Sequence, residues 1–167
     1  AKRLSIGRAP SVNTYLEERN IDHSQLNTVF KIGAPLPYQQ LAAFFSQTKY
    51  TSDELKSMLK AIFISERPYG YKYFPREPSV AVPVYSEKKE FVGFHGRFID
   101  SNKSGMQRYF NTGYLDDLHA EVLYGLHIDQ INQAIGQNKQ VIVTRGMFEL
   151  FACYQNGYIH VLATLNK

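Results

Sequence analysis

The sequence predicts an α+β fold, and three observations carry that prediction. Apolar residues recur at helical spacing from Ser11 to about Ile64. Two runs rich in β-branched and aromatic residues follow between Ser79 and Ile99, with polar residues between them. The tail, from Gln140 to Leu165, reads as strand, helix and strand. We therefore expect a helical N-terminal layer packed on a small β-sheet with a hairpin, followed by a partial α/β unit of βαβ type.

Four helices are predicted in the first third of the chain. Val12, Tyr15 and Leu16 are at helical spacing after Pro10 and Ser11. A second helix begins at Asp22, which with Gln25 forms a possible capping box before Leu26 and Val29. A third is expected over Tyr38 to Gln47. A fourth begins at a second capping box, Thr51 with Glu54, and places Leu55, Met58, Leu59 and Ile62 on one apolar face. That apolar face is interpreted as core.

The middle and end of the chain alternate between strands and helices. Ser65 to Pro78, rich in proline, glycine and tyrosine, is expected to be irregular. The two strands that follow are joined by a polar turn at Ser86 to Glu90, and Pro83 places the first at an edge or a bulge. Asp116 to Gln137 is expected to be helical, with an interruption at Gly125. In the tail, strand 140–144, helix 147–155, a glycine stop at Gly157 and strand 159–165 predict a parallel pair with a right-handed crossover.

Composition limits the protein class. A chain of 167 residues with 44% hydrophobic content can bury one core, with room for part of a second domain. The net charge of +4 is compatible with an anionic partner and carries little weight alone. Cys153, the single cysteine, excludes a disulfide framework and a cysteine-rich zinc module within the chain, which favours a reducing, cytoplasmic location. No apolar run is long enough to span a bilayer, so we expect no membrane partner.

Most named catalytic motifs are missing. There is no phosphate-binding glycine-lysine loop, no paired dinucleotide glycines, no nucleophile elbow and no metal-spaced cluster of His and Cys. The five histidines are scattered and are interpreted as surface or core residues. The Asp116-Asp117 pair is interpreted as charge at a helix N-terminus.

Two arginines in the hairpin region stand out. Arg97 and Arg108 flank a turn-like run from Asp100 to Gly105 and could face the same side, where guanidinium groups would bind phosphates and Tyr109 would stack on a base. The residues alone favour a simpler interpretation, in which both arginines are solvated and Tyr109 packs in the core. Nearby aromatic and basic residues either extend a binding surface or form a packed loop; they are Tyr69, Lys72, Tyr73 and Arg76.

The order of short motifs along the chain resembles the catalytic core of bacterial DnaG-type DNA primases. The motifs are YLEERNI, FKIGAPLP, VPVYSEKKEFVGFHGR, QRYFN, LYGL, VIVTRGMFELFACYQNG and VLATL, between Tyr15 and Leu165. The resemblance implies an N-terminal subdomain of the RNA polymerase domain over 1–136 and the start of a toprim-like βαβ unit over 137–167.

The resemblance also implies a role for the arginines, because primases of this type hold single-stranded template on a basic groove of the N-terminal subdomain. The matching residues are Arg19, Arg97, Arg108, Tyr109 and Asn111, and Lys72 and Arg76 are added as neighbours. Arg108 stands where the family usually has lysine. With the family order, template contact becomes the favoured interpretation.

The toprim part departs from the family pattern. Arg145 stands in place of a metal-binding glutamate, and Glu149 in place of the following aspartate. Since a guanidinium repels the divalent ion that phosphoryl transfer needs, we expect no catalytic residue and no cofactor in this chain; Mg²⁺ or Mn²⁺ is expected only in a complete, active family member. The aspartate-x-aspartate motif and the zinc module of the family are absent from these 167 residues.

Three hypotheses remain open. The chain is a piece of a primase-like enzyme that binds single-stranded DNA for primer synthesis in DNA replication, or a degenerate, non-enzymatic module that binds nucleic acid or a replication partner such as the replicative helicase. The third is an interaction domain whose basic surface is incidental. Salt-dependent binding of single strands separates the first two from the third.

Overall fold

The computed structural model describes residues 10–35, 54, 65–67, 70–72, 78–99, 108–112, 115 and 122–165. The helices are α1 (Pro10–Glu17), α2 (His23–Phe30), α5 (Asp129–Asn138) and α6 (Met147–Gln155). The strands are β1 (Ser65–Arg67), β2 (Gly70–Lys72), β3 (Ser79–Tyr85), β4 (Phe91–Phe98), β5 (Tyr109–Asn111), β6 (Ile142–Thr144) and β7 (Val161–Ala163). The α+β prediction is confirmed.

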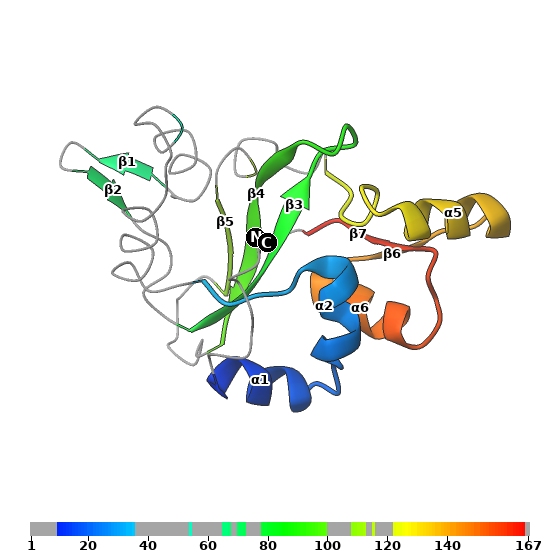
Figure 1. The fold of residues 1–167 in the computed structure, drawn as a ribbon, viewed down its shortest axis with the longest axis horizontal. Coiled ribbons are helices and arrows are strands. Elements are labelled where there is room, and N and C mark those ends of the chain that lie inside the picture. Colours follow the sequence, from blue (N-terminus) through cyan, green and yellow to red (C-terminus); the bar gives the residue numbers. More distant parts are fainter. Residues whose placement is uncertain are drawn as a thin grey trace.

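The largest sheet is antiparallel, with strand order β3-β4-β5. The predicted hairpin is confirmed: β3 and β4 pair from Ser79 opposite Phe98 to Tyr85 opposite Phe91, with a register shift between Val84 and Tyr85. Figure 1 shows this sheet beside α2 and α6, with α1 below it and α5 extending away to the right. β5 was not predicted, because a strand of three residues carries too little alternation to be recognised.

Pro83 lies on an edge strand, as predicted, because β3 ends the strand order of its sheet. The edge is nevertheless covered. Gly33 and Ala81 exchange backbone hydrogen bonds of 2.9 and 2.8 Å, so the segment after α2 lies along β3. Every residue from Ser79 to Val84 is buried.

The predicted starts of the first two helices are confirmed. Asp22 is the N-cap of α2, and its carboxylate accepts hydrogen bonds from the amides of Ser24 and Gln25. In a capping box the Gln25 side chain would accept a hydrogen bond from the Asp22 amide. Here Gln155 takes that place, because the Asp22 amide donates to its Oε1 at 3.2 Å. The Nε2 of Gln155 donates to the Asn20 carbonyl at 2.6 Å. The side-chain amide of Gln155 therefore joins the turn between α1 and α2 to the C-terminal end of α6.

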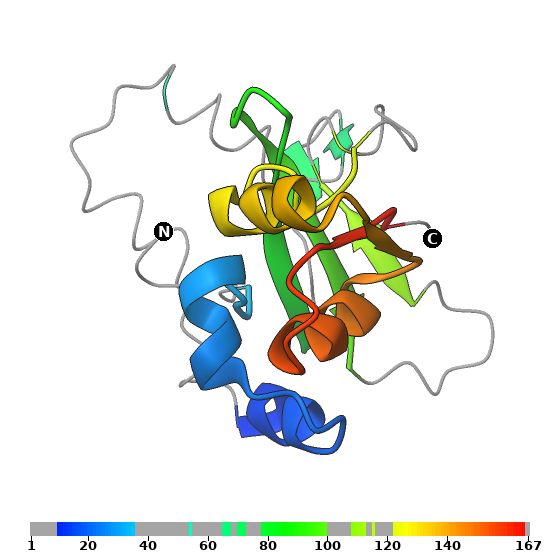
Figure 2. The ribbon, with the colours of Figure 1, turned by 90° about the vertical axis from the view of Figure 1, so that its right-hand side faces the viewer.

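The predicted βαβ unit is also confirmed. β6 and β7 pair in parallel, with Val143 opposite Leu162, and α6 connects them. Gly157 ends the helical segment with φ of +90°, a conformation that side chains strongly disfavour. Figure 2 shows α6 packed against the β6–β7 pair.

One predicted helix is wrong over part of its length. Within Asp116 to Gln137, the described residues 122–128 are not helical, and α5 begins only at Asp129. Tyr124 instead exchanges backbone hydrogen bonds with Ala163 in β7, at 2.8 and 3.0 Å. Gly125 follows with φ of +109°, which breaks the helix. Pairing with a distant strand has overridden the local helical periodicity.

The irregular structure expected for Ser65 to Pro78 is also wrong in part. β1 and β2 form an antiparallel pair, with Ser65 opposite Lys72 and Arg67 opposite Gly70. The predicted helix over Tyr38 to Gln47 lies outside the described residues. The apolar face of the next predicted helix also lies outside them; Glu54, at the start of that helix, is described and is helical. Tyr69, Tyr73 and Arg76 also lie outside them.

A single apolar cluster forms the main core. It joins residues of α1, α2, β3, α6 and β7, including Leu16, Phe30, Val82, Phe151 and Val161. The ring of Phe30 is its aromatic centre, at 5.0 Å from the rings of Phe151 and Tyr154 and 6.1 Å from that of Tyr124. The core thus contains residues from both sides of the predicted boundary at 136/137, and that boundary stays a prediction.

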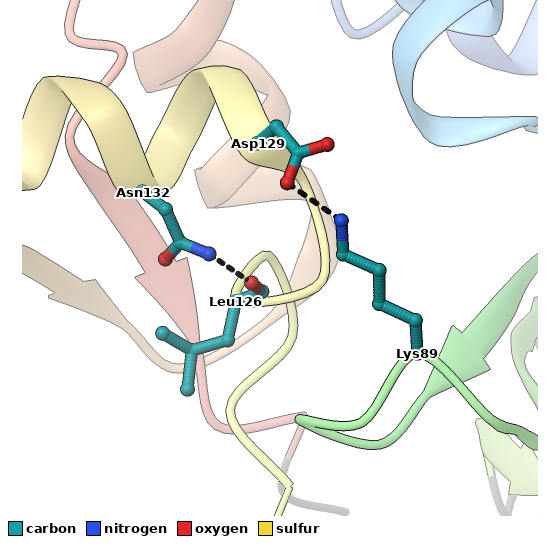
Figure 3. A network of polar contacts seen from close by, with 4 residues as sticks. All are labelled: Lys89, Leu126, Asp129 and Asn132. Atoms are coloured by element: carbon teal, nitrogen blue, oxygen red, sulfur yellow. Dashed lines mark hydrogen bonds and ion pairs between the residues drawn. The ribbon is translucent and has the colours of Figure 1, made fainter.

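Polar contacts fix the start of α5. The Lys89 ammonium, in the β3–β4 turn, lies 2.7 Å from an Asp129 carboxylate oxygen, and the Asn132 amide donates back to the Leu126 carbonyl (Figure 3). Because the side chains of Lys89 and Asp129 are 57% and 71% exposed, this ion pair contributes little to stability. It links the β3–β4 turn to the first residue of α5.

No helix among the described residues is long and apolar enough to cross a membrane.

Gly96 is required by close packing inside the sheet. A Cβ added there would lie 2.0 Å from Cζ of Phe110, a buried ring on β5. Gly96→Ala should therefore lower the free energy of unfolding by about 1–3 kcal/mol, measured by urea denaturation. Gly136→Ala is the matched control, because nothing lies within 4 Å of its added Cβ in α5; it should be neutral or stabilise by about 0.5–1 kcal/mol. Equal stability of the two variants would contradict this packing.

His127 should make stability depend on pH. Burial, and secondarily the Lys89 ammonium, lower the pKa of His127 from 6.5 to about 4, and its ring packs on Tyr85 and Tyr124. Between these two pH values His127 is protonated in the unfolded chain and neutral in the folded protein. The free energy of unfolding should therefore fall as the pH is lowered from about 6.5 towards 4.

The change His127→Phe keeps an aromatic ring in this position and removes the titration. Urea denaturation at several pH values should show a shallower loss of stability for this variant than for the wild-type protein. The same slope in both proteins would show that His127 is not the group responsible.

Candidate nucleic-acid interface

The β4–β5 register brings Arg97 and Tyr109 side by side. The two residues are paired in the sheet, and Nη1 of Arg97 donates to the Tyr109 hydroxyl at 2.7 Å. The Arg97 guanidinium carbon also lies 5.0 Å from the centroid of the Tyr109 ring. Val80, the residue opposite Arg97 on β3, belongs to the main core, so the face of the sheet that carries Arg97 is directed toward that core.

His95 supports the same strand pair from within. It is buried, its ring stacks on that of Tyr109 at 5.6 Å, and its Nδ1 lies 2.7 Å from Oδ1 of Asn111. The interpretation of His95 as a core histidine fits this burial. Its contacts fix the positions of two predicted site residues, Tyr109 and Asn111.

Helices α1 and α6 contribute the other half of the site. The guanidinium carbon of Arg19, just after α1, lies 4.2 Å from the Tyr15 ring centroid and 5.7 Å from that of Phe148 in α6. The Arg97 guanidinium carbon lies 5.9 Å from the same Phe148 centroid. One ring on α6 therefore has both arginines as neighbours. We call Tyr15, Arg19, Arg97, Tyr109 and Phe148 the arginine–aromatic cluster.

The charges of this cluster are available to an anion. Among the described residues, neither Arg19 nor Arg97 forms an ion pair with a carboxylate, and Arg19 is exposed. Arg97 is half-buried, and its Nε is itself buried without a hydrogen-bond partner in the described part of the chain, so this atom is not open to a ligand from solvent. A guanidinium has five N–H donors, so Arg97 keeps Nη donors for an anion besides the buried Nε–H and the one bound to Tyr109.

The other predicted binding residues lie apart from the cluster or outside the described part of the chain. Arg108 is exposed, and the contact seen for it is a backbone one, from the Phe98 amide to its carbonyl at 3.0 Å. Asn111 is held by His95. Lys72 ends β2, and Arg76 is not described. The structure thus brings Arg19, Arg97 and Tyr109 together and leaves Arg108 outside.

Tyr15, Phe148 and His95 also belong to this site, although the sequence did not predict them there. Tyr15 lies four residues before Arg19, a spacing at which helical side chains meet, so this contact had a signal. Phe148 had none, because its neighbours in the cluster are distant in sequence and meet only when α6 packs on the core. His95 could be placed only after the strand register was known.

Arg145 and Glu149 lie on either side of the start of α6. Both are exposed, and Arg145 occupies the bend that leads from β6 into the helix. The Glu149 carboxylate turns back over the helix N-terminus, since a Cβ added to Gly146 would lie 2.7 Å from its Oε2. This orientation suits a carboxylate at the positive end of a helix.

Comparison with protein families identifies the chain. A family model described as the N-terminal domain of the DNA primase catalytic core matches residues 1–147. The chain belongs to the DNA primase catalytic-core family. The resemblance to DnaG-type primases is therefore confirmed.

Curated relatives agree with this family. The DNA primase of Rickettsia bellii is 29% identical over 157 residues, which cover 93% of this chain and 25% of the relative. The DNA primase of Helicobacter pylori is 34% identical over 88 residues, which cover 52% of this chain and 15% of that protein. The chain thus spans about a quarter or less of the length of these primases.

Solved primase structures share the fold. The Aquifex aeolicus primase, with its zinc-binding and RNA polymerase domains, aligns with a TM-score of 0.77 and 23% identity over 98% of this chain and 38% of that one. A DnaG catalytic domain bound to single-stranded DNA aligns with a TM-score of 0.70 and 24% identity over 99% of this chain and 50% of that one.

The residues at the start of α6 do not fit the divalent metal that a primase reaction implies. The described residues contain no group of three His, Cys, Asp or Glu side chains able to hold a metal ion. Arg145, where the family pattern has a carboxylate, adds a positive charge, and Glu149 is the one acidic residue in the first turn of α6.

We expect no tight Mg²⁺ or Mn²⁺ binding at Glu149. Calorimetric titration should give the same weak response for the wild-type protein and for Glu149→Ala, because one carboxylate beside a guanidinium is a poor ligand set for these ions. Arg145→Glu, which lowers the local charge by about two units, should bind Mn²⁺ more strongly than the wild-type protein. Tight binding to the wild-type protein that Glu149→Ala abolishes would contradict this expectation.

Proposed function

We propose that this chain binds the single-stranded DNA template for RNA primer synthesis in DNA replication, as the template-holding part of a primase-like protein. The observation that carries the proposal is the convergence of Arg19 and Arg97 on the ring of Phe148 without a carboxylate partner among the described residues. Membership of the primase family and the relative solved with single-stranded DNA support it.

The charge of the cluster suits a phosphate backbone. Cationic side chains bind nucleic acid largely by neutralising phosphates, and a guanidinium offers two parallel N–H donors to phosphate oxygens. Arg19 and Arg97 come from different elements, a helix end and a strand, yet lie against one ring. They therefore reach the same short stretch of a strand.

The aromatic residues suit a single strand better than a duplex. Unpaired bases stack on aromatic side chains, whereas the bases of a duplex are stacked on each other. Tyr109 is half-buried and carries its hydroxyl at the cluster, bound by Arg97. The strand preference of the proposal rests on this ring.

A second candidate is favoured by Arg145. The positive charge at the start of α6 supports a degenerate, non-enzymatic module that grips nucleic acid or a replication partner such as the replicative helicase. In both candidates we propose that this polypeptide by itself does not polymerise nucleotides, and a cytoplasmic location fits both.

Fluorescence anisotropy of a labelled single strand of about 20 nucleotides, at several salt concentrations, tests the proposal. Arg97→Ala should weaken binding about tenfold at low salt, because one charge-assisted contact is lost. It should also make the slope of log K against log salt shallower by about 0.7. Lys88→Ala is the matched control, because Lys88 is an exposed cation in the β3–β4 turn, and it should bind as the wild-type protein does.

Thermal unfolding of each variant checks that it is folded, and Arg97→Lys, which keeps the charge, should lose less affinity than Arg97→Ala. Duplex DNA of the same length should compete poorly. A folded Arg97→Ala protein with unchanged affinity would remove Arg97 from the site. Absence of single-strand binding by the wild-type protein at low salt would overturn the proposed function and favour a protein partner.

A further inference from the structure

We propose that Phe148 is a positioning residue for template binding: its ring on α6 holds Arg19 and Arg97 in the arrangement in which both contact one strand. The proposal rests on the proposed function and deepens it. It adds a residue of the βαβ unit to a binding surface that the primase resemblance confines to the N-terminal subdomain.

Phe148 lies at the rim of the core. Met147, Leu150 and Phe151 of α6 are fully buried, whereas Phe148 is only half-buried. Its ring packs edge-on against Phe151 at 6.0 Å and against Tyr15 at 5.9 Å. The neighbouring rings thus fix the position of the Phe148 ring, and the two arginines are its other neighbours.

Phe148 also has contacts with the two arginines. Both guanidinium carbons lie within 6 Å of the Phe148 centroid, at 5.7 Å for Arg19 and 5.9 Å for Arg97. This is the range in which a cation is attracted to an aromatic face. Like charges on separate elements repel each other, so a shared ring that attracts both keeps them together when no anion is bound.

Preorganisation is the physical benefit. A long arginine side chain loses rotamer freedom when it binds a phosphate, and a contact that already orders it in the free protein reduces that cost. Two contacts order the Arg97 side chain: its hydrogen bond to the Tyr109 hydroxyl on β5 and its contact with the Phe148 ring on α6. Arg19 has two ring contacts, to Tyr15 and Phe148. Phe148 is the ring these two arginines share.

The change Phe148→Leu tests the idea, because it keeps an apolar side chain and removes the aromatic face. It should weaken binding of the single strand about threefold to tenfold, because the two arginines would then lose more rotamer freedom when they bind phosphates. The salt slope should stay at the wild-type value because both charges remain, in contrast to Arg97→Ala. Phe148→Tyr, which restores an aromatic face, should recover affinity to within about twofold of the wild-type protein.

Two controls separate positioning from other roles. Phe91→Leu alters an aromatic ring at the opposite end of β4 from Arg97, in contact with Tyr85 and Phe94, and it should leave the affinity for the single strand unchanged. In an Arg19→Ala, Arg97→Ala background, Phe148→Leu should cause no further loss, because no arginine is left to position. A further loss in that background would overturn the proposal, since the ring would then contact the strand itself.

A measurement without DNA keeps this inference distinct from the proposed function. Side-chain ¹⁵N relaxation of the arginine Nε–H groups should show that Arg97 becomes more mobile in Phe148→Leu, with recovery in Phe148→Tyr. Unchanged mobility, or unchanged DNA affinity in a folded Phe148→Leu protein, would overturn the role of Phe148. If the mobility changes but the wild-type protein binds no single strand, the template-binding function fails and the arrangement of the arginines by Phe148 stands.

Discussion

The contact between Phe30 of α2 and Phe151 of α6, with ring centroids 5.0 Å apart, is the interaction on which the arrangement of the site depends. Both rings are buried at the centre of the core, where Tyr124 and Tyr154 surround them. Because α6 connects the parallel strands β6 and β7, this contact fixes the βαβ unit against the N-terminal helices. Burial of two such rings contributes several kcal/mol at about 25 cal/mol per Å² of apolar surface.

The arginine–aromatic cluster follows from that packing. With Phe151 held in the core, Phe148 lies one turn of α6 earlier, at the rim, and its ring reaches Arg19 and Arg97. The β4–β5 register supplies Tyr109 at the same place, supported from within by His95. Three parts of the chain, far apart in sequence, thus converge on one rim of the core. Cations gathered there without carboxylate partners among the described residues are suited to bind phosphates.

Local signals predicted much of this structure, and pairing between distant segments explains what they missed. The Asp22 cap, the β3–β4 hairpin around its polar turn and the βαβ unit have sequence patterns that span few residues, and all three are present. The helical periodicity around Tyr124 lost to backbone pairing with Ala163, which no local pattern reveals. The family motifs led to Arg19, Arg97 and Tyr109, whereas Phe148 joins them only through tertiary packing.

Photocrosslinking of a single strand that carries 5-iododeoxyuridine, followed by mass spectrometry of the crosslinked peptides, tests the central claim most directly. We predict crosslinks at Tyr109 or at residues adjacent to it, because the proposed path of the strand crosses the arginine–aromatic cluster where the Tyr109 ring lies beside Arg97. These crosslinks should disappear when unlabelled single strand competes. Crosslinks confined to α5 or to the β1–β2 pair, with none at β5, would contradict that claim.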